Sequence, residues 1–274
     1  MKRLLFFFFF FFFSLCLINS AWAQLAEPNE AGLTFGHLHL NVADVEQHAQ
    51  LWTEFFGGER ITIGSLAAIK FPNMLLIMYN EAPAMDSRNT VMDHFGFKVR
   101  DIQAFRDKWE AAGHKMDPDF SGAEGQTNAY LTLPGGVYVE LQEDQSLHVP
   151  IAGYHVHFLT EGHEELLDWY TELLDIQVRT RGSIATTTNV PGMNLSFGRS
   201  STPRAATQGT AIDHIGFEIE NLENFCRKLE DRGIVFDRPY NIIESVGLGN
   251  AFLTDPRGVR IEFTEGLVRI YNGE

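Results

Sequence analysis

The chain has 274 residues and contains 36 Asp and Glu against 21 Lys and Arg, which gives a formal net charge of −15 at pH 7. This acidic balance argues against nucleic acid and anionic membrane as partners, because both bind proteins through basic faces. Of the two cysteines, one lies in the N-terminal leader, so no internal disulfide is expected and the mature chain must be held together by core burial.

The first 23 residues have the pattern of a secretory signal peptide. Lys2 and Arg3 precede an apolar run with eight phenylalanines, and the segment ends in Ala-Trp-Ala before Gln24. The apolar run is short for a membrane span of roughly 20 residues. We therefore expect cleavage after Ala23 and a secreted or periplasmic protein, with a membrane anchor as the alternative.

The next residues predict a strand, a helix and further strands. Residues 33–42 alternate apolar residues with His or small ones, as in a half-buried strand. Asp44 can cap a helix that stops at Gly57-Gly58. Two or three strands are expected after it, among them 61–71 and 74–79. This strand–helix–strands pattern comes four times, and the later units open at 91–100, 154–159 and 211–219.

Units two and four are near copies of each other. Residues 93–99 read DHFGFKV and residues 213–219 read DHIGFEI. Further on, NAYLTLPGGVYVEL at 128–141 matches NAFLTDPRGVRIEF at 250–263. A repeat of this length indicates that whole structural units were duplicated.

Units one and three match in a similar way. Aligning Trp52-Thr-Glu on Tyr170-Thr-Glu sets His37 opposite His155 and His39 opposite His157. We therefore predict an α+β protein of four βαβββ-like modules that alternate in type.

These features resemble the vicinal oxygen chelate superfamily, which includes glyoxalase I, extradiol dioxygenases, fosfomycin-resistance proteins and bleomycin-binding proteins. The resemblance rests on a His at the start of a unit with an Asp seven residues later (His37 and Asp44), an aromatic pair near the end of the helix, and DPRGVRIE in the last unit. It covers nearly all of residues 33–265. It implies that modules pair into cup-shaped mixed sheets, giving one domain at 33–142 and a second at 154–264.

In that superfamily the ligands of a divalent metal come from the first and last strands of the modules. Carried over to this sequence, the resemblance assigns one ligand set to each cup. The first cup would receive His37, His94 and Glu140, and the second would receive His155, His214 and Glu262.

A fourth ligand position, counted six residues from a turn proline, holds Met78 in module one and Phe197 in module three. Neither side chain offers oxygen or nitrogen, so three ligands are expected in each cup. Two His and one carboxylate are the pattern of non-haem Fe(II) oxygenases. Fe(II) is therefore favoured as the cofactor, with Mn(II), Zn(II) or Ni(II) as alternatives.

His39 and His157 follow the first-strand ligands by two residues. Residues i and i+2 of a strand share a face, so both should point into the cups. They are candidate catalytic groups, as general bases or hydrogen-bond partners of a substrate. Two alternatives remain: the second His of each pair could merely line the cup, or it could itself be the ligand.

The resemblance implies an exported metal-dependent enzyme, most like a dioxygenase, that binds a small molecule through adjacent oxygens. The alternatives are a non-redox lyase, isomerase or transferase of the glyoxalase type, and a non-catalytic small-molecule-binding protein. We expect no nucleic-acid partner, no membrane association after signal cleavage, and a monomer or homodimer. The sequence does not indicate the substrate.

Overall fold

The computed structural model describes residues 24–273, so the predicted signal peptide lies outside the described residues. Four βαβββ modules follow one another, as predicted. Module one comprises β1 (Leu33–Val42), α1 (Val45–Glu54), β2 (Glu59–Ile63), β3 (Leu66–Phe71) and β4 (Met74–Asn80). Module two comprises β5 (Met92–Val99), α2 (Ile102–Ala111), β6 (Phe120–Ser121), β7 (Thr127–Leu133) and β8 (Val137–Glu143).

Modules three and four repeat this order. Module three comprises β9 (Ile151–Thr160), α3 (His163–Leu174), β10 (Val178–Arg181), β11 (Ile184–Thr188) and β12 (Asn194–Arg199). Module four comprises β13 (Ile212–Ile219), α4 (Leu222–Asp231), β14 (Arg238–Ile243), β15 (Leu248–Thr254) and β16 (Arg260–Glu265). A last helix, α5 (Leu267–Asn272), follows module four, and short 3₁₀ turns occur at Ser87–Asn89 and Pro134–Gly136.

Side-chain caps begin three of the module helices. The Asp44 carboxylate accepts a hydrogen bond from the backbone N–H of Gln47 at 2.9 Å, which confirms the predicted cap of α1. Asp101 and Asn221 cap α2 and α4 in the same way, two residues after β5 and β13 end. The caps fix where each helix begins, and thereby the direction in which the chain leaves the first strand of its module.

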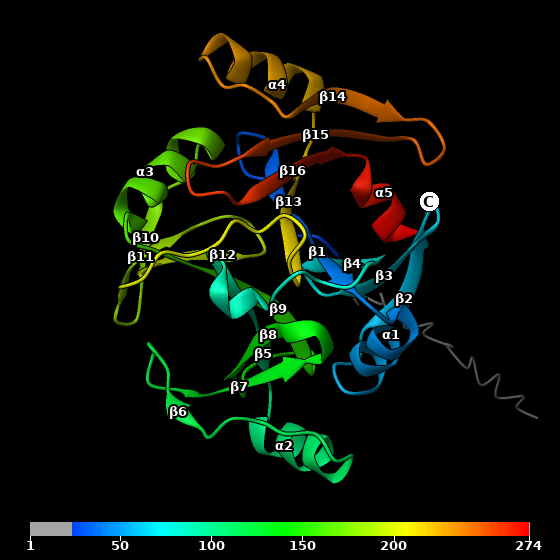
Figure 1. The fold of residues 1–274 in the computed structure, drawn as a ribbon, viewed down its shortest axis with the longest axis vertical. Helices are drawn as coiled ribbons and strands as arrows, with labels where there is room; N and C mark the ends of the chain where they lie inside the picture. The colour runs from blue at the N-terminus through cyan, green and yellow to red at the C-terminus, as the bar shows by residue number, and fades with distance from the viewer. Residues whose placement is uncertain (1–23, 274) are drawn as a thin grey trace, which may run out of the picture.

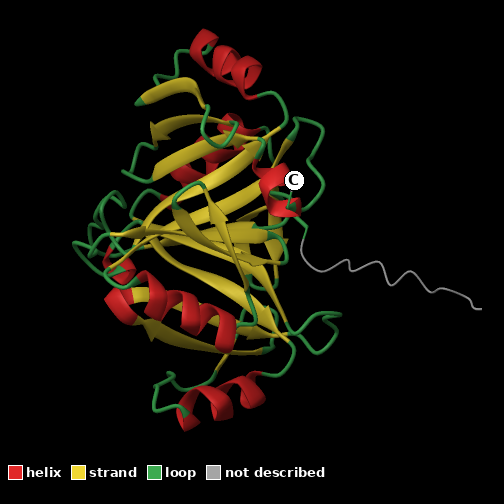
Figure 2. Ribbon diagram, turned by 90° about the vertical axis from the view of Figure 1, so that its right-hand side faces the viewer, coloured by secondary structure: helices red, strands yellow, loops and turns green. Residues whose placement is uncertain are grey.

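The strands form two eight-stranded mixed sheets (Figures 1 and 2). One has the order β14-β15-β16-β13-β1-β4-β3-β2 and joins modules one and four; the other has the order β10-β11-β12-β9-β5-β8-β7-β6 and joins modules two and three. In each sheet two first strands pair antiparallel at the centre, and each of them runs parallel to the last strand of its own module. The α+β class and the module fold are confirmed.

The predicted pairing of neighbouring modules within 33–142 and within 154–264 is wrong. Module one pairs with module four, and module two pairs with module three across the short connector 144–150. The connectors 81–91 and 200–211 cross between the sheets together. Their backbones bond to each other, as in the Val91 N–H that donates to the Ala205 carbonyl at 2.9 Å. These bonds satisfy buried backbone groups that separate crossings would leave without partners.

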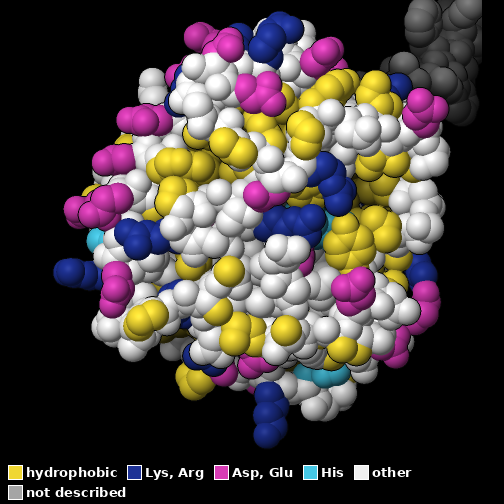
Figure 3. Space-filling view, turned by 45° about the horizontal axis from the view of Figure 1, so that its top comes forward, with side chains coloured by type: hydrophobic (Ala, Val, Ile, Leu, Met, Phe, Trp, Pro, Cys, Tyr) yellow, Lys and Arg dark blue, Asp and Glu magenta, His cyan; other side chains and the backbone are white. Residues whose placement is uncertain are grey.

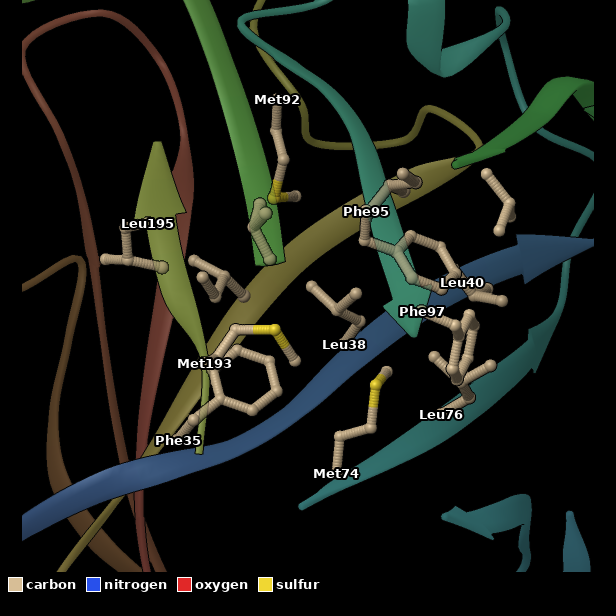
Figure 4. Packing of buried hydrophobic residues seen from close by; sticks show 14 of the residues in the cluster. Phe35, Leu38, Leu40, Met74, Leu76, Met92, Phe95, Phe97, Met193 and Leu195 are labelled. Atoms are coloured by element: carbon tan, nitrogen blue, oxygen red, sulfur yellow. The ribbon is translucent and has the colours of Figure 1, made fainter. Parts of the chain in front are cut away.

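The hydrophobic core is shared by the two sheets. Figure 4 shows Leu38 and Leu40 of β1 close to Phe95 and Phe97 of β5, which belongs to the other sheet. All of these side chains are buried. Met193, immediately before β12, is also part of this core. Because each strand alternates its faces, the residues between these core positions face the opposite side of the sheet, where polar groups gather.

The surface has no large field of one charge on the face shown in Figure 3, where hydrophobic side chains lie among acidic and basic ones. Within residues 24–273, no helix combines the length and the hydrophobicity that a membrane crossing requires.

Candidate metal centres

Four buried side chains meet on the sheet of modules one and four. We call this group centre A: His37 and His39 of β1, His214 of β13 and Glu262 of β16. The Nε2 atoms of His37 and His214 lie 2.9 and 3.1 Å from Glu262 Oε2. His39 Nδ1 lies 3.1 Å from His214 Nε2. The four donor groups therefore converge on one small volume.

A corresponding group lies on the sheet of modules two and three. We call it centre B: His94 of β5, Glu140 of β8 and His155 of β9. The Nε2 atoms of His94 and His155 each lie 3.0 Å from Glu140 Oε2. All three side chains are buried.

The six predicted ligand residues thus lie in two clusters, but the predicted membership of each cluster is wrong. His214 and Glu262 join His37, whereas His155 joins His94 and Glu140. The error follows from the module pairing, because each centre forms where two paired first strands meet the last strand of a module. The residue types of each set are unchanged by the exchange, since the modules are internal repeats.

Glycines in the DHxGF repeats make room for the histidines. A Cβ on Gly216 would lie 2.0 Å from the ring of His37, and a Cβ on Gly96 would lie 2.2 Å from the ring of His155. Neither glycine has a positive φ, so the requirement concerns space and not backbone conformation. The glycine two residues after one ligand therefore lets the partner strand's ligand approach.

Aspartates orient one histidine of each centre. Asp213 accepts from His214 Nδ1 at 2.5 Å, and Asp93 accepts from His94 Nδ1 at 2.7 Å. This contact leaves Nε2 free to face the glutamate, an arrangement common around metal-ligating histidines. An arginine donates to each aspartate, at 3.2 and 2.9 Å; the two arginines are Arg260 and Arg204.

Asparagines orient the two glutamates. Asn250 Nδ2 donates to Glu262 Oε1 at 3.1 Å, and Asn128 Nδ2 donates to Glu140 Oε1. The sequence analysis missed this side-chain role of the two asparagines. Burial disfavours the charged form of Glu262, but hydrogen bonds from two histidines hold its pKa well below the usual range. The carboxylate is therefore ionised, as a metal ligand must be.

His39 and His157 both face pockets beside the centres, as their spacing predicts. His39 is 2% exposed and belongs to centre A, whereas His157 is partly exposed and lies outside the ligand group of centre B. Burial lowers the pKa of both imidazoles well below the ordinary value, and the nearest histidine of each centre lowers it further. Both rings are therefore neutral at pH 7.

The fourth ligand position is one residue away from the predicted one. In β16 and β8 the glutamate lies opposite the residue two after the first-strand histidine. In β4 and β12 that position holds Ile77 and Ser196. Met78 and Phe197 are the next residues along, and both are part of the hydrophobic core. Ile77 offers no donor atom, as expected, but Ser196 carries a hydroxyl oxygen, which is hydrogen-bonded to Thr187 at 3.3 Å, so the expectation of no oxygen at this position is wrong for β12. Neither strand supplies a carboxylate at this position.

Each centre opens into a small pocket. The pocket at centre A measures about 220 Å³, and its lining includes His37, His39, Tyr79, Arg238, Phe252 and Glu262. The pocket at centre B measures about 230 Å³, and its lining includes Phe120, Asn128, Tyr130, Glu140, His157 and Arg181. Both volumes are below the range of roughly 300–1,000 Å³ that holds drug-sized ligands, which indicates small ligands.

Arg181 was not singled out from the sequence. Its side chain is 9% exposed, and Nη1 donates to Gln142 Oε1 at 3.2 Å. Its Nε is buried and has no hydrogen-bond partner among the described residues. Nη1 also lies 3.6 Å from Glu124 Oε2, so the guanidinium is already paired with one carboxylate of the protein.

The donor sets fit a divalent metal ion. Ligands at about 2.1 Å from an ion and at right angles to each other are separated by about 3 Å, and the imidazole–carboxylate distances of both centres are 2.9–3.1 Å. The distal Nδ1 atoms of His37 and His155 are buried without a partner among the described residues. The only polar contact of each of these rings is therefore made through Nε2, toward the glutamate.

The chain is similar to known proteins in part of its sequence and in its fold. Residues 154–263 match the family model of the Glyoxalase/Bleomycin resistance protein/Dioxygenase superfamily. No curated protein matches the chain in sequence. Among solved structures, glyoxalase I from Zea mays is similar with a TM-score of 0.70 and 14% identity, covering 88% of this chain and 95% of that chain.

A protein from Bacillus subtilis, provisionally named a dioxygenase, is similar with a TM-score of 0.63 and 11% identity, covering 89% of this chain and 86% of that chain. At these identities the likeness concerns the fold, and it spans all four modules. Residues 154–263 are thus similar in sequence to the Glyoxalase/Bleomycin resistance protein/Dioxygenase superfamily, the vicinal oxygen chelate superfamily that the sequence resembles, and residues 24–273 share the fold of glyoxalase I.

Proposed function

We propose that the protein is a divalent-metal-dependent enzyme that binds a small organic substrate through two adjacent oxygens, with a dioxygenase reaction at centre B. The observation that carries this proposal is the donor set of His94, His155 and Glu140 beside a pocket. Two His and one carboxylate suit Fe(II) best, and Mn(II), Zn(II) or Ni(II) are alternatives. The bound ion would supply Lewis acidity and, as Fe(II), a binding position for dioxygen.

Residues around the donors keep them in place. Asp93 fixes the tautomer and the ring plane of His94, and Asn128 fixes one oxygen of Glu140 so that the other faces both imidazoles. Fixed donors need no reorganisation when the substrate arrives, which is the electrostatic advantage of a preorganised site.

The walls of the pocket indicate the substrate class. Tyr130 and Phe120 stack with ring centroids 5.0 Å apart and form an aromatic wall. Arg181 lines the pocket, and its guanidinium, which lies 3.6 Å from Glu124 Oε2, can also pair with an anionic group of a substrate. His157 is a neutral imidazole in the pocket and can accept a proton from a bound hydroxyl group. A small aromatic diol that carries a carboxylate matches these three features.

Dioxygen consumption tests this function directly. Anaerobically Fe(II)-loaded protein is mixed with catechols, with and without a ring carboxylate, and dioxygen uptake is followed with an electrode. We expect uptake by the wild type and its loss in Glu140→Gln, whereas Glu262→Gln, the matched change at centre A, retains uptake. If fully loaded protein consumes no dioxygen with any of these substrates, the dioxygenase proposal is wrong.

A non-redox reaction of the glyoxalase type is the second candidate, and centre A favours it. A fourth donor, His39, lies within this centre and would leave fewer positions open for both a substrate and dioxygen. Turnover of a hydroxy or keto compound without oxygen, sustained by Mn(II), Ni(II) or Zn(II), would select this candidate. Ligand binding that survives a chelator, without turnover, would instead indicate the non-catalytic alternative.

We also propose that the protein is exported, since residues 1–23 carry the pattern of a signal peptide. N-terminal sequencing of protein from the periplasm or medium is expected to begin at Gln24. Retention of Lys2 and Arg3 in the purified protein would contradict cleavage. Each centre takes all of its donor groups from one chain, so neither centre requires a dimer.

A further inference from the structure

The two centres differ in what their second histidine does. His39 and His157 occupy equivalent places, two residues after His37 and His155 on the first strands. At centre A the rings of His39 and His214 are 4.5 Å apart, and His39 is part of the donor group. At centre B, His157 stands outside the donor group although its ring is 5.0 Å from that of His94.

A tyrosine-for-glycine difference accounts for the two positions. Tyr79 of β4 stacks on His39, with ring centroids 3.7 Å apart and an interplanar angle of 14°. The equivalent residue of β12 is Gly198, because each lies two residues beyond the fourth-ligand position. A Cβ on Gly198 would lie 3.2 Å from His157 Nε2. The imidazole of His157 therefore lies over β12 at a position that has no side chain. Tyr79 fills the corresponding space at centre A and keeps His39 on the side of His214.

The spacing at centre A suits a fourth ligand. His39 Nδ1 is hydrogen-bonded to His214 Nε2 at 3.1 Å, and ligands at right angles around an ion, about 2.1 Å from it, are separated by a similar distance of about 3 Å. The opposite ring atom, His39 Nε2, is buried and has no hydrogen-bond partner within residues 24–273. The position that would carry a last-strand ligand here is the aliphatic Ile77. His39 therefore offers the donor that β4 does not.

We propose that His39 is the fourth metal ligand of centre A, which makes centre A a three-His, one-Glu site and leaves centre B with two His and one Glu. Tyr79 is the positioning residue that selects this arrangement. The inference rests on the proposed metal dependence and adds to it that the two centres are not equivalent. Centre A holds its ion more tightly and has fewer open positions, while centre B keeps more positions for a substrate.

Counting the histidine ligands tests the proposal. Two proteins each retain one centre: Glu140→Gln with His94→Ala retains centre A, and Glu262→Gln with His214→Ala retains centre B. Each is loaded with Co(II), and proton NMR counts the strongly shifted, exchangeable ring N–H signals, one for each bound imidazole. We expect three signals from centre A and two from centre B. Two signals from centre A would overturn the proposal.

His39→Ala and its equivalent His157→Ala are the matched pair. In the centre-A protein His39→Ala should remove one shifted signal and weaken Co(II) binding by more than the 10–100-fold that loss of a group orienting a ligand costs. In the centre-B protein His157→Ala should leave both signals and change the affinity by less than about tenfold. Affinities are measured by competition with a chelating dye. Unchanged signals and affinity in His39→Ala would show that His39 only lines the pocket.

Tyr79 is tested by a pair of substitutions that leaves the donors intact. Tyr79→Gly should lose the third signal at centre A, whereas Tyr79→Phe retains the stacked ring and should keep it. Equal spectra for the two variants would contradict the positioning role of Tyr79. If neither centre of the wild type binds Co(II), the proposed function itself fails, which is a different outcome from a centre A that binds the ion with two histidines.

Discussion

Centres A and B share a plan, but the walls around them differ. Both use a DHxG first strand, an Asn and a Glu, so the repeat conserves the geometry of the donors. The wall residues diverge. Tyr79 and Phe252 at centre A occupy the positions that Gly198 and Tyr130 occupy at centre B. The duplicated fold thus fixes where an ion can bind, and single residues on neighbouring strands decide how open each centre is.

The largest expected difference between the centres comes from their glycines. Gly216→Ala should abolish metal binding at centre A alone, because the new Cβ would lie 2.0 Å from the His37 ring and displace it. Gly96→Ala should do the same at centre B through His155. Elemental analysis should show metal content falling from two ions per chain to one in either variant. Gly249→Ala on β15 is the control, since its nearest neighbour would be a side-chain atom at 3.1 Å; full metal content in Gly216→Ala would contradict the prediction.

The second prediction concerns stability beyond the centres. Asp255 in module four is buried, accepts from the Tyr170 hydroxyl at 3.1 Å, and aligns with the apolar Leu133 of module two. Burial outweighs its hydrogen-bond donors and raises its pKa to about 6 from an ordinary value of 3.8. The folded state therefore binds this proton more tightly than the unfolded state does. The resulting stabilisation is fully present below about pH 4 and is lost as the pH rises through about 6.

Asp255→Asn keeps the acceptor and removes the titration. A pKa difference of about two units corresponds to 2–3 kcal/mol, roughly, in the free energy of unfolding. Urea unfolding of the wild type and of Asp255→Asn between pH 4 and 8 should therefore show the wild type losing about this much relative to the variant. A pH-independent difference between the two proteins would contradict the raised pKa.

The third prediction is that the aspartates tune the two centres independently. Asp213→Asn should weaken metal binding at centre A by about 10–100-fold, because the amide no longer supplies the negative charge that His214 contacts. Asp93→Asn should have the same effect at centre B. Metal titrations of the two variants should each show one weakened and one unchanged site. Equal weakening of both sites by one substitution would indicate an indirect, structural effect.

The smallest expected effect concerns the stability contributed by Tyr170 of α3, whose hydroxyl donates to Asp255. Tyr170→Phe removes a hydroxyl that donates to a buried carboxylate, and should cost about 1–2 kcal/mol of stability without changing metal content. Trp52 is the aligned residue of module one, and its indole N–H is buried without a partner among the described residues. Trp52→Phe removes no such bond, so any loss there should be free of pH dependence.

Much of each centre could be predicted from the sequence. Strand alternation placed the histidines on the polar faces, and the repeats placed His94 and Glu140 at nearly the same interval as His214 and Glu262, 46 against 48 residues. The supporting aspartates directly precede His94 and His214 in the sequence, but a single polar residue in a strand does not by itself indicate that it orients a ligand. The count to the fourth position missed by one residue because it was made from a turn proline, whereas the pairing of the last strand with the first strand decides which residue lies beside the histidines.

The sequence by itself determined the module, because a strand's alternation, a capped helix and a turn are local patterns written within about 50 residues. It also determined which residue types a metal centre would contain. Only the tertiary structure decided which modules pair, since all four first strands present similar edges and the choice depends on the crossing connectors. The same pairing decided which histidines share an ion, and stacking on Tyr79 decided where His39 lies. Those contacts join residues far apart in the chain, and no interval in the sequence records them.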